Sequence, residues 1–192
     1  MGLASDQRAD PARLVPTAVV FYGLLLAGAF VWTWLDGRSL WFMSSEAAAR
    51  GVCWPRDLSL GLAVGGALVL VSRALTVASV AGRALAESLA QLLGRLGWGA
   101  SLALAALSGV AEEAFFRGAL QPQLGLVGAS LCFAAAHFVP RRAFLPWPAF
   151  ALAAGLAFGA LFEWTGNLVA AVVAHAGVNA LNLRWLGSRA DS

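Results

Sequence analysis

Apolar runs long enough to cross a lipid bilayer recur along this sequence and limit what it can fold into. A transmembrane helix needs about 20 predominantly apolar residues, and residues 14–35 form such a run without one charged side chain. Hydrophobic residues make up 60% of the chain and charged residues 12%, against about 25% charged residues in soluble domains. An integral membrane protein is therefore expected, with the lipid bilayer as its surroundings.

Polar and proline-containing segments divide the chain into six apolar segments that we expect to span the membrane. These segments cover residues 14–35, 58–80, 99–120, 126–139, 147–164 and 168–186. Residues 81–97 carry Arg83, Glu87 and Arg95 and are typical of a short amphipathic helix at the membrane surface. The predicted fold class is an all-α polytopic membrane helical bundle, with six transmembrane helices and one short amphipathic helix. Residues 1–98 form an N-terminal membrane region and residues 99–187 a core of four spans, together one structural domain.

The N-terminal segment has a second interpretation. Arg13, the apolar run after it and the triplet Ala27-Gly28-Ala29 resemble a cleaved secretory signal. The apolar run continues beyond the triplet through Trp32 and Trp34, so a retained helix is the favoured interpretation. The first dozen residues are polar and are expected to be disordered or interfacial.

The arginines predict an orientation in the membrane. With six spans, one side holds Arg8, Arg13, Arg83, Arg95, Arg141, Arg142, Arg184 and Arg189, and the other holds Arg38, Arg50 and Arg56. Positive charge accumulates on the cytoplasmic side, so both termini are expected there. All 13 basic residues are arginine, a usage typical of a GC-rich bacterial genome, which favours a bacterial inner membrane. The basic charge is thus explained by topology and not by nucleic-acid binding.

Three charged residues interrupt the segment 99–120. A charge at the bilayer centre costs about 2.5 to 3.5 kcal/mol on insertion scales and is tolerated where it pairs or faces a cavity. Glu113 and Arg117 are four residues apart, so they share a helix face and can form an ion pair. Glu112 is rotated by about 100° from that face and needs another partner.

The only two histidines of the chain also lie in apolar segments. Phe133 and His137 are four residues apart, as are His175 and Asn179, so each pair shares a helix face. Small residues flank all these groups and allow helices to approach closely. The spacing predicts a polar pocket between three spans. These residues could instead have a purely structural role. Glu113 and Arg117 would then form a buried ion pair, and the histidines and Asn179 would form interhelical hydrogen bonds.

These residues resemble the three motifs of the CPBP family, also called the Abi or CAAX-protease-like family of intramembrane endopeptidases. The motifs read Glu112-Glu113-x-x-x-Arg117, Phe133-x-x-x-His137 and His175-x-x-x-Asn179, in that order, and the resemblance covers about residues 100–182. It implies that Glu112 is the general base, that His137 holds and polarises the water, and that His175 and Asn179 face the carbonyl oxygen as oxyanion donors. Glu113, Arg117 and Phe133 then have supporting roles.

The resemblance implies hydrolysis of a peptide bond in a membrane-embedded or membrane-anchored protein or peptide, with a C-terminal sorting or anchor segment as one candidate. No cofactor is expected. The alternative is a zinc site made by two histidines and one glutamate, although no H-E-x-x-H spacing exists. The rival functions are a polytopic transporter, which usually shows repeat symmetry, and a noncatalytic membrane immunity or scaffold protein.

Overall fold

The computed structural model describes residues 11–189, and these fold into helices joined by short connections. The first ten residues, with Arg8, and residues 190–192 lie outside the described part. The helices are α1 (Pro11–Leu35), α2 (Ser45–Arg50), α3 (Trp54–Ala78), α4 (Val80–Leu93), α5 (Trp98–Glu113), the π-helix η1 (Ala114–Leu120), α6 (Gln121–Ala136), the 3-10 turn η2 (Arg142–Phe144), α7 (Pro146–Thr165) and α8 (Val169–Gly187). The predicted all-α fold class is confirmed.

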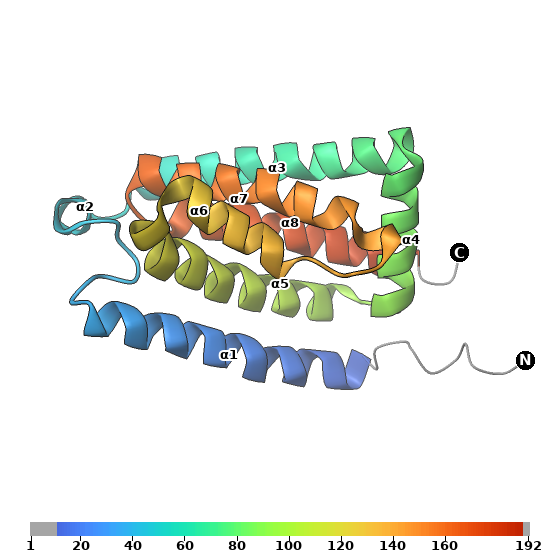
Figure 1. The fold of residues 1–192 in the computed structure, drawn as a ribbon, viewed down its shortest axis with the longest axis horizontal. Helices are drawn as coiled ribbons and strands as arrows, with labels where there is room; N and C mark the ends of the chain where they lie inside the picture. The colour runs from blue at the N-terminus through green and yellow to red at the C-terminus, as the bar shows by residue number, and fades with distance from the viewer. Residues whose placement is uncertain (1–10, 190–192) are drawn as a thin grey trace, which may run out of the picture.

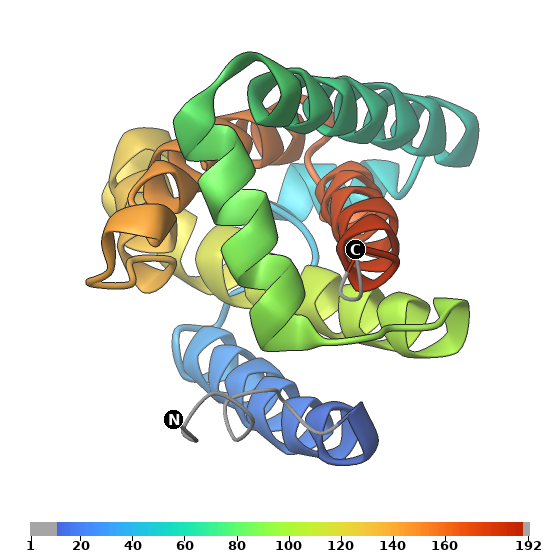
Figure 2. The same ribbon diagram turned by 90° about the vertical axis from the view of Figure 1, so that its right-hand side faces the viewer.

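The long helices lie side by side, and one short helix lies across an end of the bundle. Figure 1 shows α1, α3, α5, α6, α7 and α8 running along the long axis, with α4 crossing them at the end where both termini lie. The view along the bundle in Figure 2 shows α4 in front of this end. The connection between α6 and α7 reaches the same end. Both ends of the described chain therefore lie at the same end of the bundle as the arginine-rich connections. Which side of the membrane this end faces remains a prediction.

Four helical stretches are long and apolar enough to cross a membrane, and one of them reverses direction. They are Arg13–Leu35, Trp54–Ala78, Trp98–Ala136 and Arg142–Thr165. Within the third stretch, Gly125 has φ 70° and ψ 173°, which breaks the helix. As a result α5 and α6 run in opposite directions (Figure 1). The helix α8, which carries several polar residues, is not among the four, so the number of spans stays a prediction.

The helix α6 ends before it reaches the end of the bundle that holds α4 (Figure 1). Its last residue is Ala136, and His137 has φ −96° and ψ 6°. The predicted segment extended to residue 139 and placed His137 near its end, so α6 ends three residues earlier than predicted. The end of α6 lies beside the last turn of α5, where His137 Nε2 is 3.9 Å from Glu112 Oε2.

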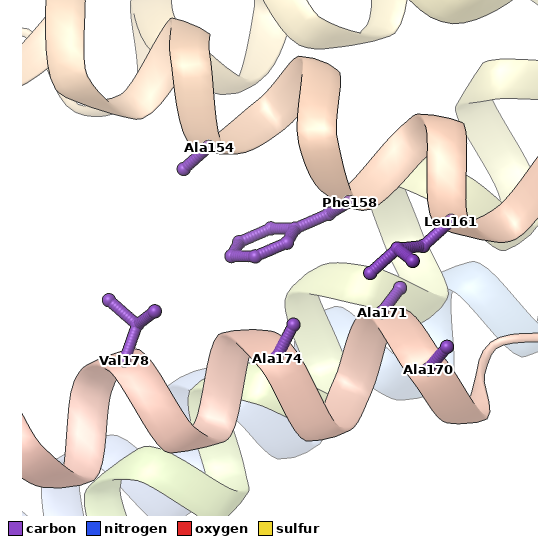
Figure 3. Close-up of a cluster of buried hydrophobic side chains, with 7 residues drawn as sticks. All are labelled: Ala154, Phe158, Leu161, Ala170, Ala171, Ala174 and Val178. Carbon is purple, nitrogen blue, oxygen red and sulfur yellow. The ribbon is translucent and has the colours of Figure 1, made fainter. Parts of the chain in front are cut away.

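Small residues bring α8 into close contact with α3 and α5. A Cβ atom at Gly65 would lie 2.9 Å from the backbone oxygen of Ala174, and one at Gly109 would lie 3.0 Å from the Cβ of Ala176. On its other side α8 packs against α7. Figure 3 shows Phe158 and Leu161 of α7 facing the alanines of α8 in one buried cluster. The polar residues of α8 are therefore held between three neighbouring helices.

A buried polar network fixes the opposite end of the bundle. Asn167 Nδ2 donates to Asp57 Oδ2 at 2.8 Å, and Arg56 Nε pairs with Asp57 Oδ1 at 2.7 Å. Asn167 Oδ1 accepts the backbone N–H of Val169 at 2.9 Å, at the start of α8. The start of α3 is thereby tied to the turn between α7 and α8, which fixes the depth of α8.

Candidate active site

The acidic pair on α5 connects three elements of the fold. Glu113 Oε2 lies 3.2 Å from Arg117 Nε, as the helical spacing predicts. Glu113 Oε1 lies 2.7 Å from His175 Nδ1 on α8. Both Glu113 and Arg117 are 0% exposed. The buried carboxylate therefore orients a histidine in addition to pairing with the arginine, and this second contact was not predicted.

Arg117 is buried because several groups replace its water shell. Its Nη2 donates to the carbonyl oxygen of Gly155 on α7 at 3.1 Å. Its guanidinium carbon lies 4.5 Å from the centre of the Phe133 ring and 5.7 Å from that of Phe158. Arginine favours such sites because its planar cation stacks on aromatic faces. Arg117 thus joins η1, α6 and α7 behind the site.

The remaining motif glutamate faces the end of α6. Glu112 Oε2 lies 3.9 Å from His137 Nε2. This separation is too long for a direct hydrogen bond, and one water molecule can bridge polar groups that far apart. His137 Nδ1 lies 2.8 Å from the carbonyl oxygen of Phe133. Because a carbonyl oxygen only accepts, Nδ1 carries a proton, and in the neutral ring Nε2 is left as an acceptor.

Asn179 lies one helical turn after His175 and points to α5. Its Nδ2 donates to Ser108 Oγ at 2.8 Å. Ser108 is four residues before Glu112, so both occupy one face of α5. A carboxamide nitrogen has two N–H groups, and the bond to Ser108 uses one. The second N–H of Asn179 is available to another acceptor.

Aromatic rings hold both histidines in place. The ring of Phe158 stacks on His175 at 5.1 Å with an interplanar angle of 16°. Phe133 contacts His137 at 4.5 Å and His175 at 5.7 Å between ring centres. Phe133, predicted only to share a face with His137, therefore lies between the two histidines.

The helix is locally widened directly after the glutamates. Residues Ala114–Leu120 form a π-helix, a distortion that is frequent at functional sites. The Arg38 guanidinium donates to the carbonyl oxygens of Gly118 and Ala119 at 3.2 and 3.3 Å. These bonds satisfy acceptors near the distorted turn and fix it to the connection after α1.

A cavity of about 550 Å³ opens onto the site. Its lining includes Tyr22, Arg73, Glu112, His137, Asn179 and Asn182. His175 is 3% exposed and is not part of the lining. The structure therefore brings Glu112, His137 and Asn179 to a common space, and places His175, Glu113, Arg117 and Phe133 behind its wall. Most of the side chains that line the cavity are apolar.

The site does not fit a three-ligand zinc centre. Within residues 11–189, no group of three or more His, Cys, Asp or Glu side chains is arranged to hold a metal ion. The third candidate ligand, His175, does not line the cavity that Glu112 and His137 share. Glu112 and His137 are left as two candidate ligands, and catalytic zinc usually has three from the protein.

Sequence reasoning missed two polar groups beside Glu112. Ser108 could have been found, since it precedes Glu112 by one helical turn on the same face. Tyr22 lies on α1 and reaches the cavity from a segment without any motif. Its only signal in the sequence is that it is the single tyrosine of the chain, in an otherwise apolar run.

Comparison with known proteins finds matches for the second half of the chain. Residues 94–181 match the family model described as "Type II CAAX prenyl endopeptidase Rce1-like". The protein "Uncharacterized protein YpbD" of Bacillus subtilis (strain 168) is 45% identical over 74 residues, which are 38% of this chain and 38% of YpbD. The match thus covers well under half of that relative. No solved structure matches the chain. The matched residues contain all three motifs, and the predicted resemblance is confirmed: residues 94–181 match a family model of the Rce1-like endopeptidase type.

Proposed function

We propose that this membrane protein is an endopeptidase that hydrolyses a peptide bond within the bilayer, with Glu112 as the general base. The observation that carries the proposal is the pairing of Glu112 and His137 across 3.9 Å at the wall of a cavity inside an apolar helical bundle. The match to a family described as endopeptidases supports the same reaction class.

The proton positions suit the activation of water. With His137 Nδ1 donating to Phe133, both Nε2 and the Glu112 carboxylate accept hydrogen bonds. A water molecule between them donates one O–H to each and keeps its lone pairs free for attack. The water oxygen adds to the amide carbon, and Glu112 takes the water proton. Glu112 then returns this proton to the leaving nitrogen as the C–N bond breaks.

The developing oxyanion requires a donor in the same space. Asn179 lines the cavity and has an N–H group besides the one that bonds to Ser108. A preorganised donor of this kind stabilises the negative charge of the tetrahedral intermediate. His175 joins it only when both ring nitrogens carry protons, because Nδ1 donates to Glu113 and Nε2 must also donate. The Glu113 carboxylate accepts the Nδ1–H bond of His175, and Arg117 balances the charge of Glu113.

The proposed reaction uses no metal. Glu112 and His137 suffice to hold the water, and His175, the third candidate ligand, does not line the cavity that they share. The proposed substrate is a membrane-embedded or membrane-anchored protein or peptide, since the cavity wall is mostly apolar and part of it is formed by helices that face lipid. A C-terminal sorting or anchor segment fits such a cavity. Both termini are proposed to lie in the cytoplasm, with the protein in a bacterial inner membrane.

The decisive experiment compares membrane-protein termini in cells that express the wild type or Glu112→Gln. This substitution keeps the size of the side chain and removes the base. We expect products with new termini in the wild type and their loss in E112Q, with equal expression of both proteins. Equal termini in the two strains would contradict the proposal. The matched control is Glu87→Gln on exposed α4, which should leave cleavage unchanged.

A further inference from the structure

A second cavity, of about 360 Å³, carries two arginines between three helices. Its lining includes Arg73 of α3, Trp98 of α5, and Arg184 and Trp185 of α8. These residues belong to the end of α3, the start of α5 and the end of α8. Figure 2 shows the end of α8 between α3 and α5. We call this cavity the arginine pocket, and none of the residues that we assign to the reaction lines it.

The two arginines of the pocket have hydrogen-bond donors that the protein does not use. Arg184 Nε is buried and has no hydrogen-bond partner in the described part of the chain. Arg73 Nη2 donates to the carbonyl oxygen of Leu181 at 3.0 Å, which uses only one N–H group of that guanidinium. Within residues 11–189, neither arginine forms an ion pair with an acidic side chain. The pocket therefore offers positive charge and N–H groups to a ligand.

Aromatic rings hold the positive charges close together. The guanidinium carbon of Arg73 lies 3.8 Å from the centre of the Trp185 ring, and that of Arg189 lies 4.5 Å from the same centre. The guanidinium carbon of Arg184 lies 5.8 Å from the centre of the Trp98 ring. Like charges that share a small space repel each other, so an anion bound among them would lower this repulsion.

The pocket is accessible from the lipid that surrounds the bundle. Leu70 and Val77 lie three residues before and four residues after Arg73, so they share its face of α3. They are 71% and 77% exposed, as expected for a face covered by acyl chains. Trp98 is also exposed, and tryptophan is enriched at the level of the lipid headgroups. A lipid headgroup in the pocket would have its acyl chains beside α3.

The depth of the arginines suits the phosphate group of a lipid. Arg73 lies five residues before the end of α3 at Ala78, about 8 Å along the axis at about 1.5 Å per residue. A long arginine side chain reaches the headgroup region from such a depth. The planar guanidinium matches a phosphate group through paired hydrogen bonds, and it keeps its charge at any physiological pH.

We propose that the arginine pocket binds the phosphate group of an anionic phospholipid, whose acyl chains lie along the exposed face of α3. Basic pockets between transmembrane helices are typical sites for anionic headgroups. The proposal is independent of the proposed peptidase function, because it concerns other residues and a different ligand. The competing explanation is that these arginines meet only the general charge of the membrane surface and hold no lipid in a defined place.

The first test measures lipid binding to the purified protein by native mass spectrometry in detergent. The protein is titrated with phosphatidylglycerol, which is anionic, or with phosphatidylcholine carrying the same acyl chains. We expect a single phosphatidylglycerol to bind at least about tenfold more tightly, since one hydrogen bond between charged groups contributes about that factor. Equal affinity for the two lipids would overturn the proposal.

The second test removes the arginines of the pocket. Arg184→Gln breaks no side-chain hydrogen bond within the described residues, and Arg73→Gln is added to it in a double variant. Both R184Q and the double variant should bind phosphatidylglycerol at least about tenfold more weakly. Thermal unfolding without lipid checks that each protein is folded, and R184Q alone decides if the double variant is not.

The matched control is the double variant Arg141→Gln with Arg142→Gln. It removes the same charge from exposed positions of the connection between α6 and α7, at the same end of the bundle. This control should bind phosphatidylglycerol within about twofold of the wild type. If R73Q/R184Q lost no more affinity than this control, the binding would reflect general surface charge and the proposed site would be wrong.

A third test distinguishes a lipid from a free anion. Inorganic phosphate at the same concentration as the lipid should not displace phosphatidylglycerol, because it has no acyl chains to lie along α3. Displacement at equal concentration would assign the pocket to a soluble anion and overturn the proposal. None of these measurements uses a substrate, so they decide the lipid site whether or not Glu112→Gln abolishes cleavage.

Discussion

At the scale of single residues, the most consequential contact is the one between Glu113 and His175. The spacing of four residues predicted the pair of Glu113 with Arg117, and the structure shows this pair at 3.2 Å. The 2.7 Å contact to His175 could not be predicted, because it joins side chains 62 residues apart on different helices. Local periodicity shows which residues share a face, and only the packing of helices shows which faces meet.

The substitution Glu113→Gln tests the importance of this contact. Glutamine keeps an oxygen that can accept from His175 Nδ1, and it loses the negative charge that faces the His175 ring and pairs with Arg117. We expect activity to fall by about ten- to a hundred-fold, as for other residues that orient catalytic groups. Steady-state kinetics on purified protein would measure the effect. Activity equal to that of the wild type would mean that His175 acts without this charge.

Removal of metal ions tests the proposed reaction at the same scale. Because Glu112 and His137 can hold the water by themselves, cleavage should continue unchanged after exhaustive dialysis against a strong chelator. Rates are compared before dialysis, after it, and after the return of zinc. Loss of activity that zinc alone restores would support a metal-dependent enzyme. The apo and zinc-treated forms of E112Q serve as inactive controls.

At the scale of the elements, the apolar segments predicted from the sequence agree well with the observed helices. The places where helices end or become irregular agree less well with the prediction. The amphipathic segment 81–97 corresponds to α4, Val80–Leu93. The early end of α6 and the π-helix after Glu113 were not predicted. Apolar residues continue through both places, so hydropathy gives no sign of them. Backbone geometry there is set by contacts with other elements, such as the bonds from Arg38 to Gly118 and Ala119.

The close packing of α5 against α8 at Gly109 leads to a prediction about this pair of helices. A valine at Gly109 would push against Ala176, whose Cβ and backbone nitrogen lie 3.0 Å from the added Cβ position. We expect Gly109→Val to separate Ser108 and Glu112 from Asn179, and to lower both activity and thermal stability. Overpacking of this kind typically costs about 1 to 3 kcal/mol. Unfolding in detergent micelles and cleavage assays would measure the two effects.

The control for this substitution is Gly66→Ala on α3, where an added Cβ meets nothing within 4 Å. Replacing a glycine inside a helix by alanine is favourable by roughly 1 kcal/mol when space allows. G66A should therefore match or exceed the stability of the wild type. If G109V were as stable and as active as G66A, the α5–α8 contact would not define the site.

At the scale of the whole molecule, the arginine distribution predicts which end of the bundle faces the cytoplasm. Cys53 is exposed just before α3, at the end opposite to the termini. A thiol reagent that cannot cross membranes should label Cys53 on intact spheroplasts. In a Cys53→Ser background, Ser188→Cys near the end of α8 should react only after the membrane is permeabilised. The reverse pattern would invert the orientation and place the termini outside.

Most of this architecture followed from the sequence, because lipid exposure imposes long apolar helices. Leu24 of α1 and Leu62 of α3 are 70% and 66% exposed, which is the pattern expected for helices covered by lipid. The cavity could not be predicted, since its wall combines residues of α1, α3, α4, α5, α7 and α8 with His137 after α6. Neither composition nor spacing specifies such an assembly.

The early end of α6 has a consequence for how water reaches the site. Backbone that leaves a helix within the bilayer is tolerated only where protein encloses it or where it borders a water-filled space. The chain after Ala136 leaves the helix beside the cavity that His137 lines. Water in this cavity would satisfy the backbone groups that are freed where α6 ends, and it would also supply the molecule that the proposed hydrolysis consumes.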